Sequence, residues 1–349
     1  MSSSCKEIPV SVIPPSEKSP HPKRVLVLGA TGTIGRATVK ALVDRGHDVV
    51  CFLRTNAGFG VDHEPDEPSR LLHGAALRFG DVTDPASIDA DGFHGEKFDV
   101  LVSCLASRTG APADAWAIDY QAHCHALKAA RADGVAHMVL LSAICVQKPL
   151  LEFQKAKLAF EAELIASGMT YSIVRPTAFF KSLSGQVDRV KQGKPFLIFD
   201  DGELTACKPI SDRDLGAFIA ECLDDPDCQN RILPIGGPGE AITPREQGEC
   251  LFRLLGRESK FKRVPVALLD TIIFTLGMLG RVSKRLRDKA ELARIGRYYA
   301  TESMLVLDPV TGRYDAAATP STGSDTLSEF YGKLIRGEAR VERGDHAVF

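Results

Sequence analysis

The segment Gly29-Ala30-Thr31-Gly32-Thr33-Ile34-Gly35 has glycines at a spacing that suits the binding of a diphosphate. A backbone approaches a diphosphate closely only where β-carbons are absent, and the glycines at 29, 32 and 35 remove them. A helix that begins inside such a turn directs free N–H groups and the positive end of its dipole at the charge. A glycine triplet alone, however, is more often an ordinary structural turn.

The elements on either side of the turn favour the functional interpretation. Residues 24–28, RVLVL, form a short apolar run typical of a strand that is buried on both faces. A helical pattern follows from about Thr33 to Asp44, and Gly46 ends it as a C-cap. The order strand, glycine turn, helix makes a dinucleotide site a strong prediction.

The second predicted strand, residues 48–53, ends at Arg54. A protein that prefers NAD more often has an acidic residue there, which holds the ribose hydroxyls. An arginine can instead pair with a 2′-phosphate through its planar guanidinium. A solvated surface arginine is the alternative, but Arg54 favours NADPH over NADH.

Four more strands continue the alternation with helices. They are predicted at residues 76–84, 99–107, 138–142 and 170–175, with helices at 116–132 and 151–167. Six such strands imply an α/β fold, a doubly wound parallel Rossmann-type sheet whose ligands lie beyond the carboxyl ends of the strands. The cofactor-binding residues expected at that edge are Gly29, Thr31, Gly32, Thr33, Ile34, Gly35, Arg54, Asp81 at the adenine, Val82, Cys104, Leu105, Ala106 and Ser142.

Composition excludes several other classes. The chain has 349 residues, of which 44% are hydrophobic and 25% charged, as in a globular protein. A formal net charge of -2 gives no general attraction to nucleic acid. The nine cysteines are scattered and include no C-x-x-C pair, so we expect reduced thiols and no metal site.

The chain divides into three predicted parts. Residues 1–22 are rich in serine and proline and lack the apolar run of a secretory signal, so we expect a disordered leader. Residues 23–180 form the NADPH-binding domain, and residues 181–349 mainly form a smaller α+β substrate lobe with segments that return to the first domain. An organellar transit peptide would have more arginine and fewer acids than this leader, so a cytoplasmic, bacterial setting is expected.

Three segments at the predicted sheet edge resemble those of the atypical short-chain dehydrogenase/reductase superfamily. They are GATGTIG near the N-terminus, GDVTD after the third strand and RPTAFF after the sixth. The superfamily places a Tyr-x-x-x-Lys pair on the helix after the fifth strand. In that register this chain has Phe153 and Lys157, so the lysine is kept and the tyrosine is absent.

Longer segments narrow the resemblance. LLEFQKAKLAFEAEL, RPTAFFKSLSGQV, KPISDRDLGAFI, LPIGGPGEAITPREQGE and YYATESMLVLDP are similar to those of the divinyl chlorophyllide a 8-vinyl reductase family, over residues 23–335. The resemblance implies NADPH-dependent reduction of the 8-vinyl group of a divinyl chlorophyllide or protochlorophyllide to ethyl, in chlorophyll or bacteriochlorophyll synthesis. A conjugated vinyl group accepts hydride without a carbonyl oxygen to protonate, so the absence of the tyrosine fits.

The resemblance also assigns roles to individual residues. Lys157 is the catalytic residue and orients the nicotinamide ribose, with Pro176 and Thr177 beside the nicotinamide. Phe153, Phe179 and Phe180 offer apolar surface to a flat macrocycle, although simple core packing is an equal alternative for the last two.

Within residues 264–289, residues 264–280 are strongly apolar, and a basic flank follows with Arg281, Lys284, Arg285, Arg287 and Lys289. The apolar run is short for a membrane span. The open alternatives are a helix on a lipid surface, peripheral to photosynthetic membranes, and a lid over the substrate. Two other functions compete with the reductase: an NADP-binding sensor or assembly protein without catalysis, and an isoflavone-reductase-like enzyme. The oligomeric state is not predicted.

Overall fold

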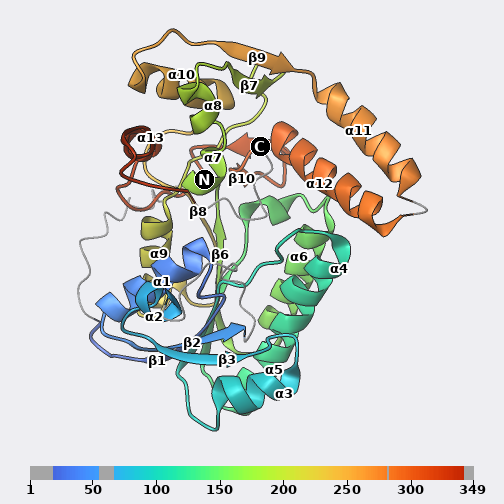
Figure 1. The fold of residues 1–349 in the computed structure, drawn as a ribbon. Helices are drawn as coiled ribbons and strands as arrows, with labels where there is room; N and C mark the ends of the chain where they lie inside the picture. Colours follow the sequence, from blue (N-terminus) through green and yellow to red (C-terminus); the bar gives the residue numbers. More distant parts are fainter. Residues whose placement is uncertain (1–18, 55–66, 281–282, 342–349) are drawn as a thin grey trace, which may run out of the picture.

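The computed structural model describes residues 19–54, 67–280 and 283–341. At its centre lies a parallel sheet of seven strands in the order β3-β2-β1-β4-β5-β6-β8 (Figure 1). The expected doubly wound parallel sheet is therefore confirmed. The strands are β1 (Arg24–Leu28), β2 (Asp48–Arg54), β3 (Ala76–Gly80), β4 (Val100–Ser103), β5 (His137–Leu141), β6 (Thr170–Pro176) and β8 (Arg231–Ile235).

The seventh strand corrects the expectation of six. β8 comes from the second half of the chain and pairs with β6, with Arg175 opposite Pro234. Because proline cannot donate to a neighbouring strand, a sheet edge is where such a strand fits. The second half thus returns to the sheet and extends it.

Helices cover both faces of the sheet because its strands alternate apolar side chains between them. In β1, Val25 and Val27 join a buried cluster with α1 (Thr33–Asp44) and α9 (Asp212–Glu221), while Leu26 and Leu28 join another on the opposite face. That second cluster includes α5 (His123–Ala132) and α6 (Glu152–Ala166). Figure 1 shows these two helical layers on either side of the strands.

The helix expected at residues 116–132 is longer and less regular. It begins as α4 (Pro112–Ala115), continues as a π-helical segment over Trp116–Ala122, and ends as α5. π-helical turns are rare and are frequently found at functional sites. Asp119 lies inside this segment.

The remaining elements of the second half form a smaller layer above the sheet edge. Strands β7 (Phe196–Phe199) and β9 (Phe261–Val264) are parallel, and the rings of Phe196 and Phe261 pack edge to face with their centroids 6.2 Å apart. Its other elements are α7 (Phe180–Leu183), α8 (Val187–Lys191), α10 (Pro244–Leu254), β10 (Val306–Leu307), β11 (Tyr314–Asp315) and α13 (Leu327–Arg336).

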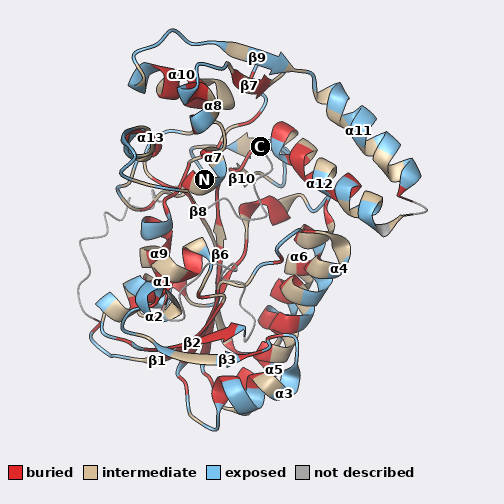
Figure 2. Cartoon of the chain, in the orientation of Figure 1, coloured by how far each residue is buried: buried red, intermediate tan, exposed pale blue. Residues whose placement is uncertain are grey.

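Helices α11 (Val266–Leu279) and α12 (Lys284–Thr301) form a hairpin that projects from this layer. No residue of α11 is buried, although the helix is almost entirely apolar. Figure 2 shows the contrast between exposed α11 and the buried strands. Among the described residues, no helix has both the length and the hydropathy needed to cross a bilayer.

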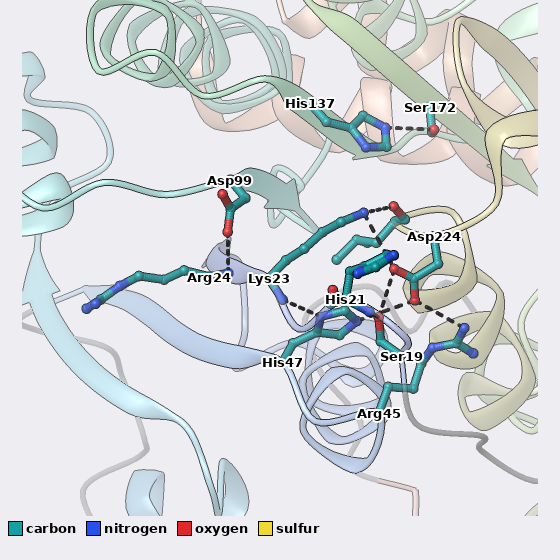
Figure 3. A network of polar contacts seen from close by, with 11 residues as sticks. Ser19, His21, Lys23, Arg24, Arg45, His47, Asp99, His137, Ser172 and Asp224 are labelled. Carbon is teal, nitrogen blue, oxygen red and sulfur yellow. Dashed lines mark hydrogen bonds and ion pairs between the residues drawn. The ribbon is translucent and has the colours of Figure 1, made fainter.

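A polar network ties the chain together at the amino ends of the strands (Figure 3). Asp224 accepts a hydrogen bond from Ser19 at 3.0 Å and lies 3.3 Å from Arg45 and 3.5 Å from Lys23. Ser19 is buried. Residues 19–22 thus contact the folded chain, which differs from the expected leader of residues 1–22; residues 1–18 lie outside the described part.

Candidate active site

The glycine turn lies at the carboxyl ends of the central strands, between β1 and α1. Gly29 has φ +75°, and a β-carbon there would stand 2.6 Å from the carbonyl carbon of Cys104. A β-carbon on Gly35 would stand 2.1 Å from the carbonyl oxygen of Gly29. Both glycines are therefore required by the fold itself, because no other residue fits without moving backbone.

Gly32 differs from its two neighbours in the motif. A β-carbon there would be 3.4 Å from the Gly29 oxygen, an ordinary contact, and Gly32 is exposed. Gly32 is the N-cap of α1, without a side-chain cap, and the first helical turn contains no acidic residue. Its backbone N–H groups and dipole are thus available to an anion. Thr31, Thr33 and Ile34 complete the turn.

Arg54 and Asp81 lie together at the next edge of the sheet. Arg54 pairs with Gly80 in the β2–β3 register, and its charge contributes to a lowered pKa of Asp81. The larger causes of that lowering are hydrogen bonds from Thr83, whose N–H and hydroxyl lie 2.8 and 2.7 Å from Asp81 Oδ1. Arg54 is exposed, as a residue that meets a ligand phosphate would be, whereas Val82 is buried.

The residues after β4 lie beside the glycine turn at the carboxyl ends of the strands. The N–H of Cys104 donates to the Leu28 carbonyl at 2.9 Å, which holds this segment against the glycine turn. Burial raises the pKa of the Cys104 thiol to about 12, so it stays protonated and is no nucleophile. Leu105 is half-buried and Ala106 is exposed.

Ser142, at the end of β5, is buried and already engaged. Its hydroxyl donates to Glu161 Oε1 at 2.5 Å, and Glu161 also pairs with Arg175. The predicted cofactor contact of Ser142 would therefore use its backbone or need this hydrogen bond to rearrange.

Lys157 points inward from α6 to a buried carboxylate. Its Nζ lies 3.0 Å from Asp119 Oδ1, and the two side chains are 11% and 0% exposed. Asp119 Oδ1 also accepts from the N–H of Ser107 at 3.2 Å. The other oxygen, Oδ2, is buried with no hydrogen-bond partner among the described residues. The pair fixes the lysine ammonium in one position.

His123 secures the π-helical segment that carries Asp119. Its Nδ1 donates to the carbonyl of Ile118 at 2.8 Å, and because a carbonyl only accepts, Nε2 accepts from Ser103 Oγ at 2.9 Å. Burial, and secondarily the charge of Lys157, lowers the pKa of His123 to about 4. His123 is therefore neutral and holds position instead of exchanging protons.

Asp119 and His123 were not predicted as site residues from the sequence. The available signal was their spacing of four, which puts two polar residues on one face of a helix whose other face is apolar. The sequence gives no comparable signal for the π-helical segment or for the buried partner of Asp119, Lys157 on α6.

Phe153 lies where the first half meets α12. It packs in a cluster with Ile295 of α12. Gly110 lies close to both side chains, because a β-carbon added to it would stand 2.9 Å from Ile295 Cδ1 and 3.7 Å from Phe153 Cδ1. The ring is half-buried, so part of it remains open. Phe153 is thus an apolar wall four residues from Lys157.

The residues after β6 are placed differently from one another. Thr177 is buried, and its hydroxyl donates to the Lys208 carbonyl. Phe179 is half-buried and bridges to Ile210, beside Pro176 at the end of β6. Phe180 is 4% exposed and packs against Phe330 at 5.5 Å, so in this structure it serves the core, and a substrate contact there would require that cluster to open.

A parallel doubly wound sheet with a glycine turn before the first helix defines a dinucleotide-binding protein of the Rossmann type. A family model described as NAD(P)H-binding matches residues 29–226. The chain is 53% identical to the divinyl chlorophyllide a 8-vinyl-reductase of Zea mays, over 98% of this chain and 85% of the relative. It therefore belongs to the divinyl chlorophyllide a 8-vinyl-reductase family.

Two more distant proteins are also similar to this chain, one in structure and one in sequence. The NADPH complex of the quinone oxidoreductase QOR2 from Escherichia coli has a TM-score of 0.64 at 17% identity, covering 89% of this chain and 99% of that one. The photosystem II assembly factor Ycf39 of Cyanophora paradoxa is 27% identical, over 70% of this chain and 73% of its own length.

The expectation of a cytoplasmic setting is wrong. The reductases of Zea mays and of rice, 53% and 54% identical to this chain, are both chloroplastic. The composition of residues 1–22 therefore did not decide the setting.

Proposed function

We propose that this chain uses NADPH to reduce the 8-vinyl group of a divinyl chlorophyllide to an ethyl group. The observation that carries the proposal is the 53% identity over 98% of the chain, which takes in the second half as well as the dinucleotide-binding part. The site is consistent with it: a buried, fixed lysine beside an apolar wall, with phenylalanine where an alcohol dehydrogenase of this superfamily has tyrosine.

The chemistry needs no proton donor at position 153. NADPH held in this site would supply a hydride, and the C–H bond would form at the terminal vinyl carbon as the vinyl π bond breaks. The electron pair passes into the conjugated macrocycle, and a proton then adds to complete the ethyl group. A carbonyl, by contrast, would need an acid at its oxygen.

Each half of the cofactor has a proposed partner in this chain. The glycine turn and the N-terminus of α1 hold the pyrophosphate, and Arg54 pairs with the 2′-phosphate, which favours NADPH over NADH. Asp81, Val82 and the segment Cys104 to Ala106 line the adenosine and central parts. Lys157 holds the nicotinamide ribose, with Asp119 behind it as a positioning residue.

The macrocycle is proposed to lie against the open parts of Phe153 and Phe179. Both rings are half-buried beside the nicotinamide end of the predicted cofactor site. Flat aromatic surfaces suit a planar ligand of this kind. Divinyl protochlorophyllide differs from the chlorophyllide outside the reacting vinyl group, so it is proposed as an alternative substrate.

A direct test is a turnover assay with NADPH and divinyl chlorophyllide. The expected product carries two more hydrogens than the substrate, with one NADPH oxidised per molecule reduced. The non-catalytic alternative, in the manner of an assembly factor, predicts NADPH binding without oxidation. The assay therefore separates the two functions.

The exposed face of α11 is proposed to contact an anionic lipid surface. Its large apolar side chains are open to solvent, with Phe274 67% and Met278 56% exposed. The basic residues Arg285, Arg287 and Lys289 follow on the exposed part of α12, which matches anionic headgroups. Arg281 lies outside the described residues, and the side chain of Lys284 is not described.

Flotation with liposomes tests this contact. The protein is expected to float with phosphatidylglycerol vesicles, and Phe274→Ser with Met278→Ser should abolish flotation. Val310→Ser is the matched control, because it removes a 90% exposed apolar side chain that lies outside the α11–α12 hairpin. Wild-type protein that stays at the bottom of the gradient would leave α11 as a lid over the substrate.

A further inference from the structure

A lysine from the second half of the chain reaches the glycine turn. Lys181 lies in α7, and its Nζ donates to Thr33 Oγ1 at 3.0 Å. Thr33 is the first residue of α1, directly after the N-cap Gly32. Residues 148 positions apart in the sequence thus meet at the point where an anion would bind.

The backbone that carries Lys181 is held firmly. The N–H of Phe180 donates to the Ile210 carbonyl at 3.1 Å, and Tyr331 donates its hydroxyl to the Leu183 carbonyl at 2.7 Å. Phe180 is also packed against Phe330. The ammonium therefore reaches Thr33 from a short helix that is anchored in the core of the second half.

The groups at the N-terminus of α1 create a positive electrostatic potential. The first turn of α1 contains no carboxylate, and its N-cap supplies no side-chain acceptor. The N–H groups of the turn and the helix dipole are positive, so a lysine added here increases the positive potential. A cation beside other donors is stabilised by a bound anion, and a diphosphate is the anion that this turn is shaped to accept.

We propose that Lys181 is a pyrophosphate-binding residue for the nicotinamide cofactor. It adds a point charge to the backbone donors of the glycine turn, and through α7 it links cofactor binding to the packing of the second half. The inference rests on the nicotinamide-dinucleotide part of the proposed function and is independent of the vinyl substrate.

Equilibrium titration of both reduced cofactors, followed by dihydronicotinamide fluorescence, tests Lys181 without turnover. Lys181→Met is expected to raise the Kd for NADPH and for NADH by the same factor, roughly tenfold, or about 1.4 kcal/mol. Lys181→Arg should keep most of the affinity. Arg54→Ala should instead weaken NADPH alone, because NADH lacks the 2′-phosphate.

Lys40→Met is the matched control, because it removes the same charge from an exposed position on α1 near Asp44. Its Kd values should equal those of the wild type. An unchanged Kd in Lys181→Met, or a change confined to NADPH, would overturn the proposal. Thermal unfolding of each variant without cofactor checks that the fold is kept, and Lys181→Gln, which also removes the charge, replaces Lys181→Met in the titrations if that variant is unstable. Wild-type protein that binds neither cofactor would refute the cofactor site itself.

Discussion

Replacing Lys157 with methionine is expected to lower kcat/KM for divinyl chlorophyllide by at least about 100-fold, the scale of loss when a reactant is misplaced by about an ångström. Lys157 is the cation that we propose to hold the nicotinamide ribose, and Asp119 fixes it at 3.0 Å. Steady-state kinetics with NADPH in excess measures the effect. An unchanged kcat/KM would remove Lys157 from the site.

The same substitution is expected to destabilise the protein as well, because Lys157 is paired with a buried carboxylate. Asp119 is fully buried, so losing its partner leaves an uncompensated charge, at a cost of roughly 3–5 kcal/mol. Lys157→Met combined with Asp119→Asn removes both charges and should recover most of the free energy of unfolding. If turnover returned together with stability in that double variant, the lysine would be structural only.

Two alanine substitutions in the glycine turn are expected to have different effects: Gly35→Ala should lower the stability of the fold, and Gly32→Ala should lower the affinity for the cofactor. In Gly35→Ala the new β-carbon would meet backbone at 2.1 Å, so we expect a loss of roughly 2–3 kcal/mol of folding free energy. In Gly32→Ala the nearest backbone atom is 3.4 Å away, so stability should change by no more than about 1 kcal/mol.

Although Gly32→Ala should lose little stability, it should lose much of its affinity for the cofactor. The β-carbon of Gly32→Ala would stand at the exposed N-cap, where the diphosphate must approach, so the Kd for NADPH should rise at least about tenfold, or 1.4 kcal/mol. Urea unfolding without cofactor and fluorescence titration measure the two quantities separately. Normal NADPH binding by Gly32→Ala would contradict the position assigned to the pyrophosphate.

The first half of the fold could be predicted because its signals are local. β1 and α1 have the predicted bounds, Arg24–Leu28 and Thr33–Asp44, since an apolar strand, a glycine turn and a helix follow one another directly. β8 was missed because its five residues, RILPI, contain a proline and pair with β6 about sixty positions away. Nothing within such a short segment specifies its neighbour.

The residues of the candidate site also differ in whether local sequence could predict them. The glycine turn, Arg54 and Lys157 could be predicted as site residues from spacing and register, because each belongs to one local motif. Asp119, His123 and Lys181 act through partners distant in sequence: Lys157, Ser103 and Thr33. Burial of Phe180 against Phe330 is a further case, since two adjacent aromatics give no indication of which one faces the core.

The most direct test of the account is the absorption spectrum of divinyl chlorophyllide during incubation with the purified protein and NADPH. Loss of a conjugated vinyl group should shift the Soret band to the blue, in step with NADPH oxidation, and omission of NADPH should abolish the shift. A Soret band that stays in place while NADPH is demonstrably bound would contradict the reductase and leave a cofactor-binding protein without this chemistry.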